Sequence, residues 1–272
     1  MITRFAPSPT GLLHLGHAFS ALEVWRLARG AGGTVLLRIE DVDSERCRPV
    51  YDQAIRDDLH WLGFDWLEPV LRQSTNLDAY RATLAALDER GLVYPCSCTR
   101  TDIAAHAPAI GWDGYVYPGT CRARPMSDRG PRDAVRLDLA AALSGIGPLA
   151  FTETGPLFAG DHRPGPADLL THIGDPVLWR KTGDPAYHLA CPHDDAAQGV
   201  THVIRGADLW HATFLHVVLQ AVMGWPTPMY HHHDLVRDPR GQRLAKIDKS
   251  RAIASYREEG LTPDDIWSLI GV

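Results

Sequence analysis

Lysine is scarce in this chain. Only three of its 27 basic residues are lysines, namely Lys181, Lys246 and Lys249. The net charge is −6 at pH 7, which excludes a generally basic protein that coats nucleic acid, so any nucleic-acid contact must be local. Because Lys246 and Lys249 stand close together, their segment is a candidate functional element.

Long apolar runs and a disulfide framework are also missing. No apolar run reaches about 18 residues, and the first residues contain no apolar core, so the sequence predicts neither a membrane span nor a signal peptide. The five cysteines are an odd number and do not form the dense, even set of a small disulfide scaffold. We therefore expect a protein of the reducing cytoplasm with no membrane partner.

The remaining composition is that of an ordinary globular protein. Hydrophobic residues make up 45% of the 272 and charged residues 22%, which excludes a disordered chain. A chain of this length can bury a full core. The 24 glycines and 20 prolines predict many turns.

The N-terminal region predicts a βαβ unit. Residues 2–6 are short and β-prone, residues 7–11 form a Pro- and Gly-containing turn, and a helix ending near Gly30 precedes a buried strand at 34–39. The crossover is expected to be right-handed. The helix carries its apolar face at helical spacing: Ala21, Val24, Trp25 and Ala28.

The pattern divides the chain into four parts. Residues 1–95 are expected to form the first half of a nucleotide-binding catalytic domain. Residues 96–180 are rich in proline and glycine, hold three cysteines and lack clear periodicity, so they predict an inserted subdomain. Regular patterning resumes for the second half, 181–235, and 236–272 predict a mobile lysine loop and a short helical stem.

Several element boundaries are predicted from local signals. A helix follows Pro49, and another begins with Asn76 as its N-cap. Residues 186–189 are interpreted as the start of a strand, so the proline in the following Cys191-Pro192-His193 would interrupt its hydrogen bonds. Asp208 is predicted to cap a long helix that ends at Gly224.

His14-Leu15-Gly16-His17 lies where a strand gives way to a helix. A helix N-terminus offers free N–H groups and partial positive charge, which suits phosphate binding. The two histidines, at i and i+3, can donate hydrogen bonds to a polyphosphate, and Gly16 leaves room for a flat base or sugar. The alternative is two ordinary histidines at a helix start.

The segment 236–251 has six basic and two acidic residues and contains the sequence Lys246-Ile247-Asp248-Lys249-Ser250. Two lysines and a serine on a mobile loop can close over a triphosphate and stabilise the charge on a leaving pyrophosphate. A solvated charged loop is the alternative. The two lysines of this segment make the functional interpretation the stronger one.

These two motifs, in this order, carry a family resemblance. Residues 4–11 (Arg-Phe-Ala-Pro-Ser-Pro-Thr-Gly), followed by 14–17, resemble the opening of glutamyl-tRNA synthetases. The similarity continues at 38–41 (Arg-Ile-Glu-Asp) and from Tyr187 onward, and 246–250 resemble the second motif of class I synthetases. The resemblance covers most of the chain.

Within that family, the sequence is most similar to the truncated glutamyl-queuosine tRNA(Asp) synthetases. The similarity includes residues 94–100, 198–201 and the form of the lysine segment at 246–250. The chain ends 22 residues after Ser250, so we expect no anticodon-binding domain. The resemblance implies a Rossmann-like class I α/β catalytic domain with an inserted zinc-binding, acceptor-type subdomain and a short helical stem.

The resemblance also implies an activity. Members of this branch activate L-glutamate with ATP and Mg²⁺ to glutamyl-adenylate and transfer it to the queuosine base in the anticodon of tRNA(Asp). In this sequence, the catalytic residues are then His14, His17, Lys246 and Lys249, and ATP binds at His14, Gly16, His17 and Lys249. A monomer is expected.

Other functions stay open at this stage. The chain can be a compact glutamyl-tRNA synthetase that acylates the tRNA 3′ end, or a non-catalytic tRNA-binding paralogue of a synthetase. A nucleotidyltransferase that acts on another amino acid also fits, because one sequence does not fix the selectivity of a pocket.

A glutamate pocket needs cationic anchors for two carboxylates and an anion for the ammonium group. Arg4 and Arg205 can make fork-shaped carboxylate contacts, Glu40 can pair with the ammonium, and Tyr187 can bind a carboxylate. A surface arginine and a core aromatic are the alternatives for Arg205 and Tyr187. The resemblance places these around glutamate together with a run of neighbours: Phe5, Ala6, Pro7 and Ser8.

Three cysteines form a metal candidate. Cys96, Cys98 and Cys121 can supply three thiolates to zinc, which prefers four donors in a tetrahedron. The resemblance supplies Tyr117 as the fourth ligand, with Tyr115 and His106 as rival donors. Three free thiols are the alternative. A bound zinc would help a Pro- and Gly-rich insert to fold with little core.

The remaining candidates are interpreted as follows. Cys47 and Cys191 are isolated, and the histidine tract at 231–233 is non-functional, because three adjacent residues of a strand cannot all face one ion. Five arginines after the zinc candidate either contact the tRNA backbone or form a solvated face: Arg122, Arg124, Arg129, Arg132 and Arg136.

Overall fold

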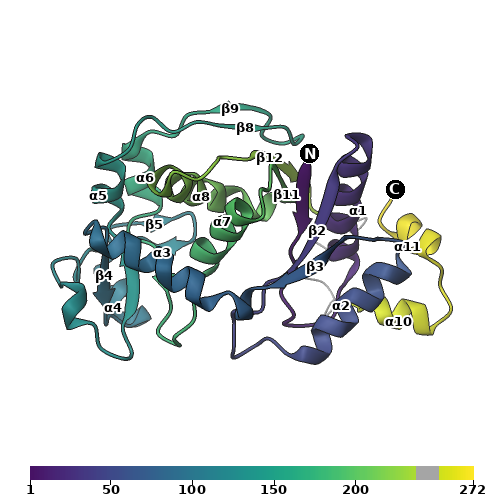
Figure 1. The fold of residues 1–272 in the computed structure, drawn as a ribbon, viewed down its shortest axis with the longest axis horizontal. Coiled ribbons are helices and arrows are strands. Elements are labelled where there is room, and N and C mark those ends of the chain that lie inside the picture. Colours follow the sequence, from purple (N-terminus) through teal and green to yellow (C-terminus); the bar gives the residue numbers. More distant parts are fainter. Residues whose placement is uncertain (237–250) are drawn as a thin grey trace.

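The computed structural model describes residues 1–236 and 251–272, and parallel strands form its centre (Figure 1). The N-terminal sheet is parallel and has the order β1-β2-β3. A backbone hydrogen bond from Thr201 N to Ile2 O (2.9 Å) places β1 beside the first strand of a second sheet, which has the order β11-β12-β8-β9. The bounds are β1 Ile2–Phe5, β2 Thr34–Ile39, β3 Leu67–Arg72, β8 Phe151–Glu153, β9 Gly160–His162, β11 His202–Gly206 and β12 Met229–His233.

The predicted βαβ unit is confirmed. Helix α1 (Leu15–Gly30) connects β1 to β2, and these strands pair in parallel. The predicted apolar face of α1 is buried against the strands, with Trp25 and Val24 among the core residues. Helix α8 (Trp210–Met223) makes the equivalent connection from β11 to β12, and it ends at Gly224, whose φ of 68° favours glycine.

A third, antiparallel sheet lies at the opposite end of the molecule from α1, in the order β10-β7-β4 (Figure 1). A two-stranded hairpin, β5-β6, accompanies it. Their bounds are β4 Val93–Cys96, β5 Ile110–Gly111, β6 Gly114–Tyr115, β7 Ala134–Leu137 and β10 Val177–Trp179. The other helices are α2 Pro49–Trp61, α3 Leu77–Glu89, α4 Arg100–His106, α5 Leu139–Ser144, α6 Pro166–His172, α7 Tyr187–Ala197, α10 Ile253–Glu258 and α11 Pro263–Leu269.

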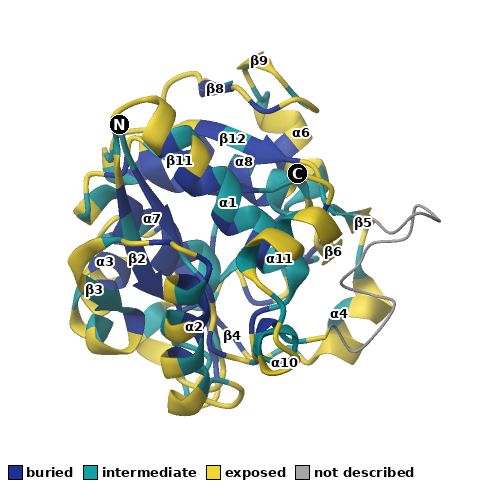
Figure 2. Cartoon of the chain, turned by 90° about the vertical axis from the view of Figure 1, so that its right-hand side faces the viewer, coloured by how far each residue is buried: buried dark blue, intermediate teal, exposed yellow. Residues whose placement is uncertain are grey.

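Two apolar clusters stabilise this arrangement, and Figure 2 shows the central strands as its most buried part. One cluster packs α1 and α2 on the N-terminal strands and includes Trp25 and Leu59. The other joins β7 to α3, α7 and α8 and includes Leu137, Leu189 and Val218. The segment 96–180 therefore packs into a core that it shares with the flanking segments.

Two local predictions are wrong, and a third is confirmed only in position. Residues 187–197 form helix α7 rather than a strand, so Pro192 interrupts no strand hydrogen bonds. Asn76 stands at the N-cap position of α3, but its amide donates to Asp194 Oδ1 (3.0 Å) instead of capping the helix. Asp208 lies in a 3₁₀ turn, and α8 begins two residues later without a side-chain cap.

Among residues 1–236 and 251–272, no helix has the length and apolar character that crossing a membrane requires.

Candidate active site

A cavity of about 570 Å³ opens between the N-terminus of α1 and the carboxyl ends of β1 and β11. The carboxyl ends of parallel strands are the usual ligand-binding edge of such sheets. Every predicted glutamate or ATP residue within the described chain lines this cavity: Arg4, Phe5, Ala6, Pro7, Ser8, His14, Gly16, His17, Glu40, Tyr187 and Arg205. The fold thus gathers residues 1–40 and 187–205 at one site.

Arg4 points from β1 into a buried ionic cluster. Its Nε lies 2.8 Å from Asp195 Oδ1, and the same carboxylate oxygen lies 2.8 Å from Nη1 of Arg38. Burial alone would raise the pKa of Asp195, but the two guanidinium groups lower it to about 2. The fork of Arg4 is therefore occupied by a protein carboxylate, while the residue still lines the cavity.

Glu40 follows β2 and forms the anionic wall of the cavity. It accepts a hydrogen bond from Arg38 Nη2 (3.2 Å) and is 8% exposed. Burial raises the pKa of Glu40, and Arg38 and Arg4 oppose that rise. A ligand ammonium group would meet a carboxylate that is held in place from behind.

Cys191 belongs to this cluster, so its interpretation as an isolated residue is wrong. Its Sγ lies 3.5 Å from Arg38 Nη2 and 3.8 Å from Asp195 Oδ2. Burial raises the pKa of the Cys191 thiol to about 12. The group is therefore a neutral thiol that packs one turn before Asp195 on α7.

Arg205 lines the cavity from β11, the strand beside β1. Its guanidinium donates to Tyr187 Oη (3.0 Å) and Thr213 Oγ1 (2.7 Å). Because the Tyr187 oxygen accepts from arginine, its own O–H is free to donate to a ligand. Arg205 is thus an oriented side chain inside the molecule and not the surface arginine that the sequence left open.

The structure adds site residues that sequence reasoning missed. His232 is buried and accepts from Arg205 Nε (3.0 Å), and His233 lines the cavity and contacts Ser20 Oγ (3.1 Å). From the sequence, the tract at 231–233 is interpreted as non-functional. Strand alternation and the buried end of β12 are a signal that could have identified His232 and His233. The further lining residues are Phe19, Ser20, Ile204, Gly206, Asp208, Leu209, His233, Asp234, Leu235 and Val236.

The two histidines at the start of α1 cap their own helix. Gly16 N donates to His14 Nδ1 (3.1 Å), and His14 N donates to His17 Nδ1 (3.2 Å). A neutral imidazole whose Nδ1 accepts must carry its proton on Nε2. Burial, and then the neighbouring His14, lower the pKa of His17 to about 3, so His17 is a neutral Nε2–H donor at physiological pH.

The rings of His14 and His17 stack, with centroids 3.8 Å apart. A Cβ on Gly16 would come within 3.1 Å of the His14 ring, so an alanine here would require that ring to shift. Lys246 and Lys249, the remaining predicted catalytic residues, lie outside the described residues.

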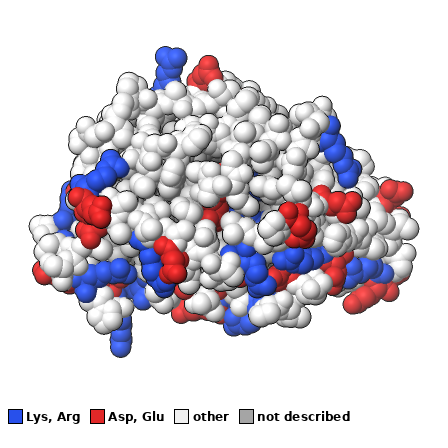
Figure 3. All heavy atoms as spheres, in the orientation of Figure 1, with Lys and Arg blue, Asp and Glu red and all other residues white. Residues whose placement is uncertain are grey.

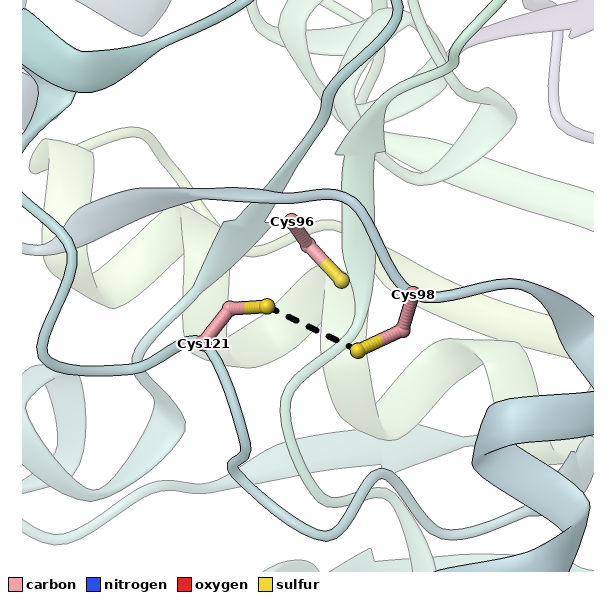
Figure 4. A group of neighbouring side chains, drawn as sticks. All are labelled: Cys96, Cys98 and Cys121. Atoms are coloured by element: carbon pink, nitrogen blue, oxygen red, sulfur yellow. Dashed lines mark hydrogen bonds between the residues drawn. The ribbon is translucent and has the colours of Figure 1, made fainter.

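Three cysteines converge beside the antiparallel sheet, and Figure 4 shows their side chains pointing toward one another. The sulfur atoms of Cys96, Cys98 and Cys121 all lie within 4.8 Å of one another. Burial alone would raise the pKa of Cys121, but hydrogen bonds, first among them the one with Tyr117, lower it to about 6. A thiolate at neutral pH is the form that binds a metal ion.

Tyr117, the predicted fourth donor, lies next to the cysteines. Its Oη is 3.3 Å from the sulfur atoms of both Cys96 and Cys98. Tyr115 is exposed on β6, and His106 is exposed on α4 with its Nδ1 next to a carbonyl of its own helix. The donor set that the fold assembles is therefore three sulfur atoms and one phenol oxygen, which fits the chemistry of zinc.

Three of the five arginines that follow the cysteines are held by contacts within the protein, although the Arg122 side chain stays exposed. Arg122 pairs with Asp175 (2.7 Å) and Arg124 with Asp133 (2.7 Å). Arg136 is buried over the Tyr117 ring. Figure 3 shows acidic and basic side chains interspersed along the lower edge of the face drawn there. Arg129 and Arg132 are exposed, and their contact with tRNA stays a prediction.

The chain contains a class I tRNA synthetase catalytic domain, which the match of its sequence to a family model shows. The family model described as tRNA synthetases class I (E and Q), catalytic domain, matches residues 1–110 and 166–271. The predicted class I synthetase α/β fold and the predicted ligase class are therefore confirmed.

The chain belongs to the family of glutamyl-Q tRNA(Asp) synthetases. It is 53% identical over 283 residues to the glutamyl-Q tRNA(Asp) synthetase of Rhodobacter capsulatus, and the match covers 100% of each chain. A second relative of the same name, from Deinococcus radiodurans, is 42% identical over an alignment of 270 residues, and the match covers 96% of this chain and 84% of the relative. The predicted family is confirmed.

Solved structures agree with this assignment. A glutamate tRNA ligase from Elizabethkingia meningosepticum, crystallised in complex with its amino acid, matches with a TM-score of 0.75 and 25% identity. The match covers 100% of this chain and 60% of that chain, so this chain spans about three fifths of the length of the ligase.

Proposed function

We propose that this chain activates L-glutamate with ATP to glutamyl-adenylate and transfers the glutamyl group to the queuosine base in the anticodon of tRNA(Asp). The observation that carries this proposal is the cavity, which brings two arginines, one glutamate and a helix N-terminus together. The names of the most similar relatives supply the tRNA and the position of transfer.

Glutamate would bind between the two arginines. Arg4 and Arg205 both line the cavity and are both held by protein groups, so they face a ligand without further ordering. The Tyr187 hydroxyl donates to a ligand carboxylate, and Glu40 accepts from the ammonium group. Phe5, Ala6, Pro7 and Ser8 form the wall beside them.

ATP would bind at the start of α1. The Nε2–H groups of His14 and His17 and the partial positive charge of the helix N-terminus meet the phosphates. A glutamate α-carboxylate oxygen attacks the α-phosphorus, the bond to the β-phosphate oxygen breaks, and pyrophosphate leaves. Mg²⁺ bound with ATP neutralises phosphate charge. We propose that Lys246 and Lys249 stabilise the leaving pyrophosphate.

In the second step, a hydroxyl of the queuosine cyclopentene ring attacks the carbonyl carbon of the adenylate. The new ester bond forms as the bond to AMP breaks, and AMP leaves with the electron pair. The residues of the cavity hold the glutamyl group in place during this transfer, so positioning and charge stabilisation carry the catalysis.

One structural zinc is proposed at Cys96, Cys98, Tyr117 and Cys121. The convergence of three sulfur atoms and a phenol oxygen supports this site. Bound there, the ion ties β4 to the turn that contains Cys121.

We propose the domain organisation that the sequence predicts. Residues 1–95 and 181–235 form the two halves of the nucleotide-binding catalytic domain, residues 96–180 form a zinc-containing insert, and residues 236–272 form a lysine loop with a helical stem. We also propose a monomer in the cytoplasm that binds glutamate, ATP and queuosine-containing tRNA(Asp).

Amino-acid-dependent ATP–pyrophosphate exchange tests the first step. Purified protein without tRNA is assayed with each of the twenty amino acids in turn. Exchange with glutamate alone supports the proposed substrate. Exchange with a different amino acid contradicts it, and so does the absence of exchange both without and with queuosine-containing tRNA(Asp).

A further inference from the structure

A buried glutamate–histidine pair lies directly behind Arg205. Glu153 Oε2 is 2.6 Å from His232 Nδ1, and the Glu153 and His232 side chains are both 0% exposed. On its other edge, His232 Nε2 accepts from Arg205 Nε at 3.0 Å. The three side chains thus form a line that ends at the cavity.

The protonation states in this line are determined by the hydrogen bonds. Arginine Nε can only donate, so His232 Nε2 must be unprotonated and the ring proton must lie on Nδ1, facing Glu153. Burial lowers the pKa of His232. Burial alone would raise the pKa of Glu153, but its hydrogen bonds to His232 and Gly155 place it below the ordinary value. Glu153 is therefore a carboxylate, and His232 beside it is a neutral imidazole.

The backbone also holds Glu153 in place. Its Oε1 accepts from His232 N (2.8 Å) and from Gly155 N (2.6 Å). A Cβ on Gly155 would come within 2.3 Å of His232 O, so only glycine allows this close approach. Glu153 lies on β8, within residues 111–165, which the family model does not match.

We infer that Glu153 is a positioning residue for glutamate recognition: it fixes the tautomer of His232, which in turn orients the Arg205 guanidinium toward the substrate. The inference rests on the proposed glutamate pocket. Thr213 and Tyr187 bind the terminal nitrogens of Arg205, and His232 binds the remaining Nε, so the plane of the guanidinium is determined by all three.

The substitution Glu153→Gln tests this role because it keeps the size of the side chain and changes one bond. With Oε1 still accepting from the two backbone N–H groups, the amide nitrogen must face His232 Nδ1. Two donors then meet, unless the ring proton moves to Nε2. There it opposes Arg205 Nε–H, so the guanidinium loses its orientation.

Kinetics in the exchange assay give the first readout. For Glu153→Gln we expect KM for glutamate to rise about tenfold, because the loss of one well-oriented charged hydrogen bond weakens binding by about that factor. KM for ATP stays unchanged, because the ATP end of the cavity lies on α1. Because KM does not depend on the fraction of folded protein, this readout still applies if Glu153→Gln is partly unfolded. Asp161→Asn, on the neighbouring exposed strand β9, is the matched control and leaves both KM values unchanged.

The tautomer of His232 gives a second readout that does not need activity. In ¹⁵N-histidine-labelled wild-type protein, the His232 signals are those of an Nδ1–H tautomer, and Glu153→Asp, which keeps the charge, retains them. An Nε2–H tautomer in the wild type overturns the inference, even if Glu153→Gln does not fold. An unchanged KM for glutamate in a folded Glu153→Gln protein overturns it as well.

The two proposals fail in different ways. Wild-type protein that exchanges with no amino acid, either without or with queuosine-containing tRNA(Asp), contradicts the proposed function, while the His232 tautomer still reports on the pair. Wild-type exchange with glutamate, combined with a Glu153→Gln variant of normal KM, contradicts the positioning role alone.

Discussion

One carboxylate oxygen, Oδ1 of Asp195, lies 2.8 Å from the guanidinium of Arg4 and 2.8 Å from that of Arg38. Arg4 comes from β1, Arg38 from β2 and Asp195 from α7, so the contact joins the two parts of the chain that form the cavity. All three side chains are nearly inaccessible to solvent. The ionic contact therefore determines where Arg4 presents its charge.

Asp195→Asn should destabilise the fold and weaken glutamate binding together. Removing one partner of a buried ion pair leaves uncompensated charge, which lowers the free energy of unfolding by about 3–5 kcal/mol. Urea unfolding at pH 7.5 measures this. Asp78→Asn breaks the exposed pair of Asp78 with Arg81 and serves as the control without a stability change. Equal stability of both variants would contradict a structural role for Asp195.

His17→Ala should slow glutamate activation with little change in KM for glutamate. Removing one hydrogen-bond donor that contacts the phosphate in the transition state lowers kcat about 100-fold or more. The pKa of His17 is lowered to about 3, so titration of His17 gives the wild-type exchange rate no inflection between pH 5 and 8.

Exchange kinetics of wild type and His17→Ala over that pH range test both statements. His106→Ala changes an exposed histidine on α4 and should behave as wild type. A kcat of His17→Ala within twofold of wild type rules out the proposed phosphate contact.

Cys121→Ser should abolish zinc binding, since it removes a sulfur that faces Cys98 at 3.5 Å. Metal analysis is expected to find one zinc per wild-type chain and none in the variant. The melting temperature falls by about 2–4 °C for each kcal/mol that the ion contributes. Cys47→Ser, outside the cluster, keeps the metal.

The fourth ligand has its own matched pair of variants. Tyr117→Phe removes the oxygen beside the sulfur atoms and should weaken zinc affinity in chelator competition, whereas Tyr115→Phe should not. Equal affinities would exclude Tyr117 as a ligand.

Asp58→Asn should stabilise the protein at high pH. Within the described residues, neither oxygen of this buried carboxylate receives a hydrogen bond, and its charged partner Arg257 lies 3.3 Å away. Burial raises the pKa of Asp58 from 3.8 to about 6. The fold thus favours the protonated form, and the stability associated with it is present below about pH 4 and lost as the pH rises through about 6.

About two pKa units correspond to roughly 2.7 kcal/mol, and this difference already includes the attraction of Arg257. We therefore expect Asp58→Asn to raise the free energy of unfolding at pH 8 by about 2–3 kcal/mol. At pH 4 this gain should vanish. Asp57→Asn, its exposed neighbour, makes the same charge change as a control. A lower stability of Asp58→Asn at pH 8 would show that the ion pair outweighs the burial.

The sequence was most informative where a signal is local. The continuous apolar run at 34–39 predicted β2, since a strand of a parallel sheet is buried on both faces. The helical spacing of Val24 and Trp25 predicted α1, because that periodicity shows which face of the helix is buried. The motif at 14–17 predicted the helix N-terminus that lines the cavity, because the motif lies where a strand gives way to a helix.

Prediction failed where tertiary contacts decide. Four residues at 186–189 suit a strand or a helix equally, and only their packing against α8 makes them the start of α7. Glu153 and His232 are 79 residues apart, and no local pattern connects them to Arg205. The ion pair of Arg4 with Asp195 could not be predicted from the sequence either. Asp195 lies on α7, a segment whose pattern predicts a strand.

Transfer of labelled glutamate to tRNA(Asp), followed by mapping of the labelled nucleotide, tests the central claim most directly. Two substrates are compared: tRNA(Asp) with queuosine in the anticodon, and the same tRNA with unmodified guanosine there. We predict label only in the first tRNA and only on the queuosine nucleotide. Label at the 3′-terminal nucleotide of either tRNA would contradict the claim and identify the chain as a synthetase that acylates the 3′ end.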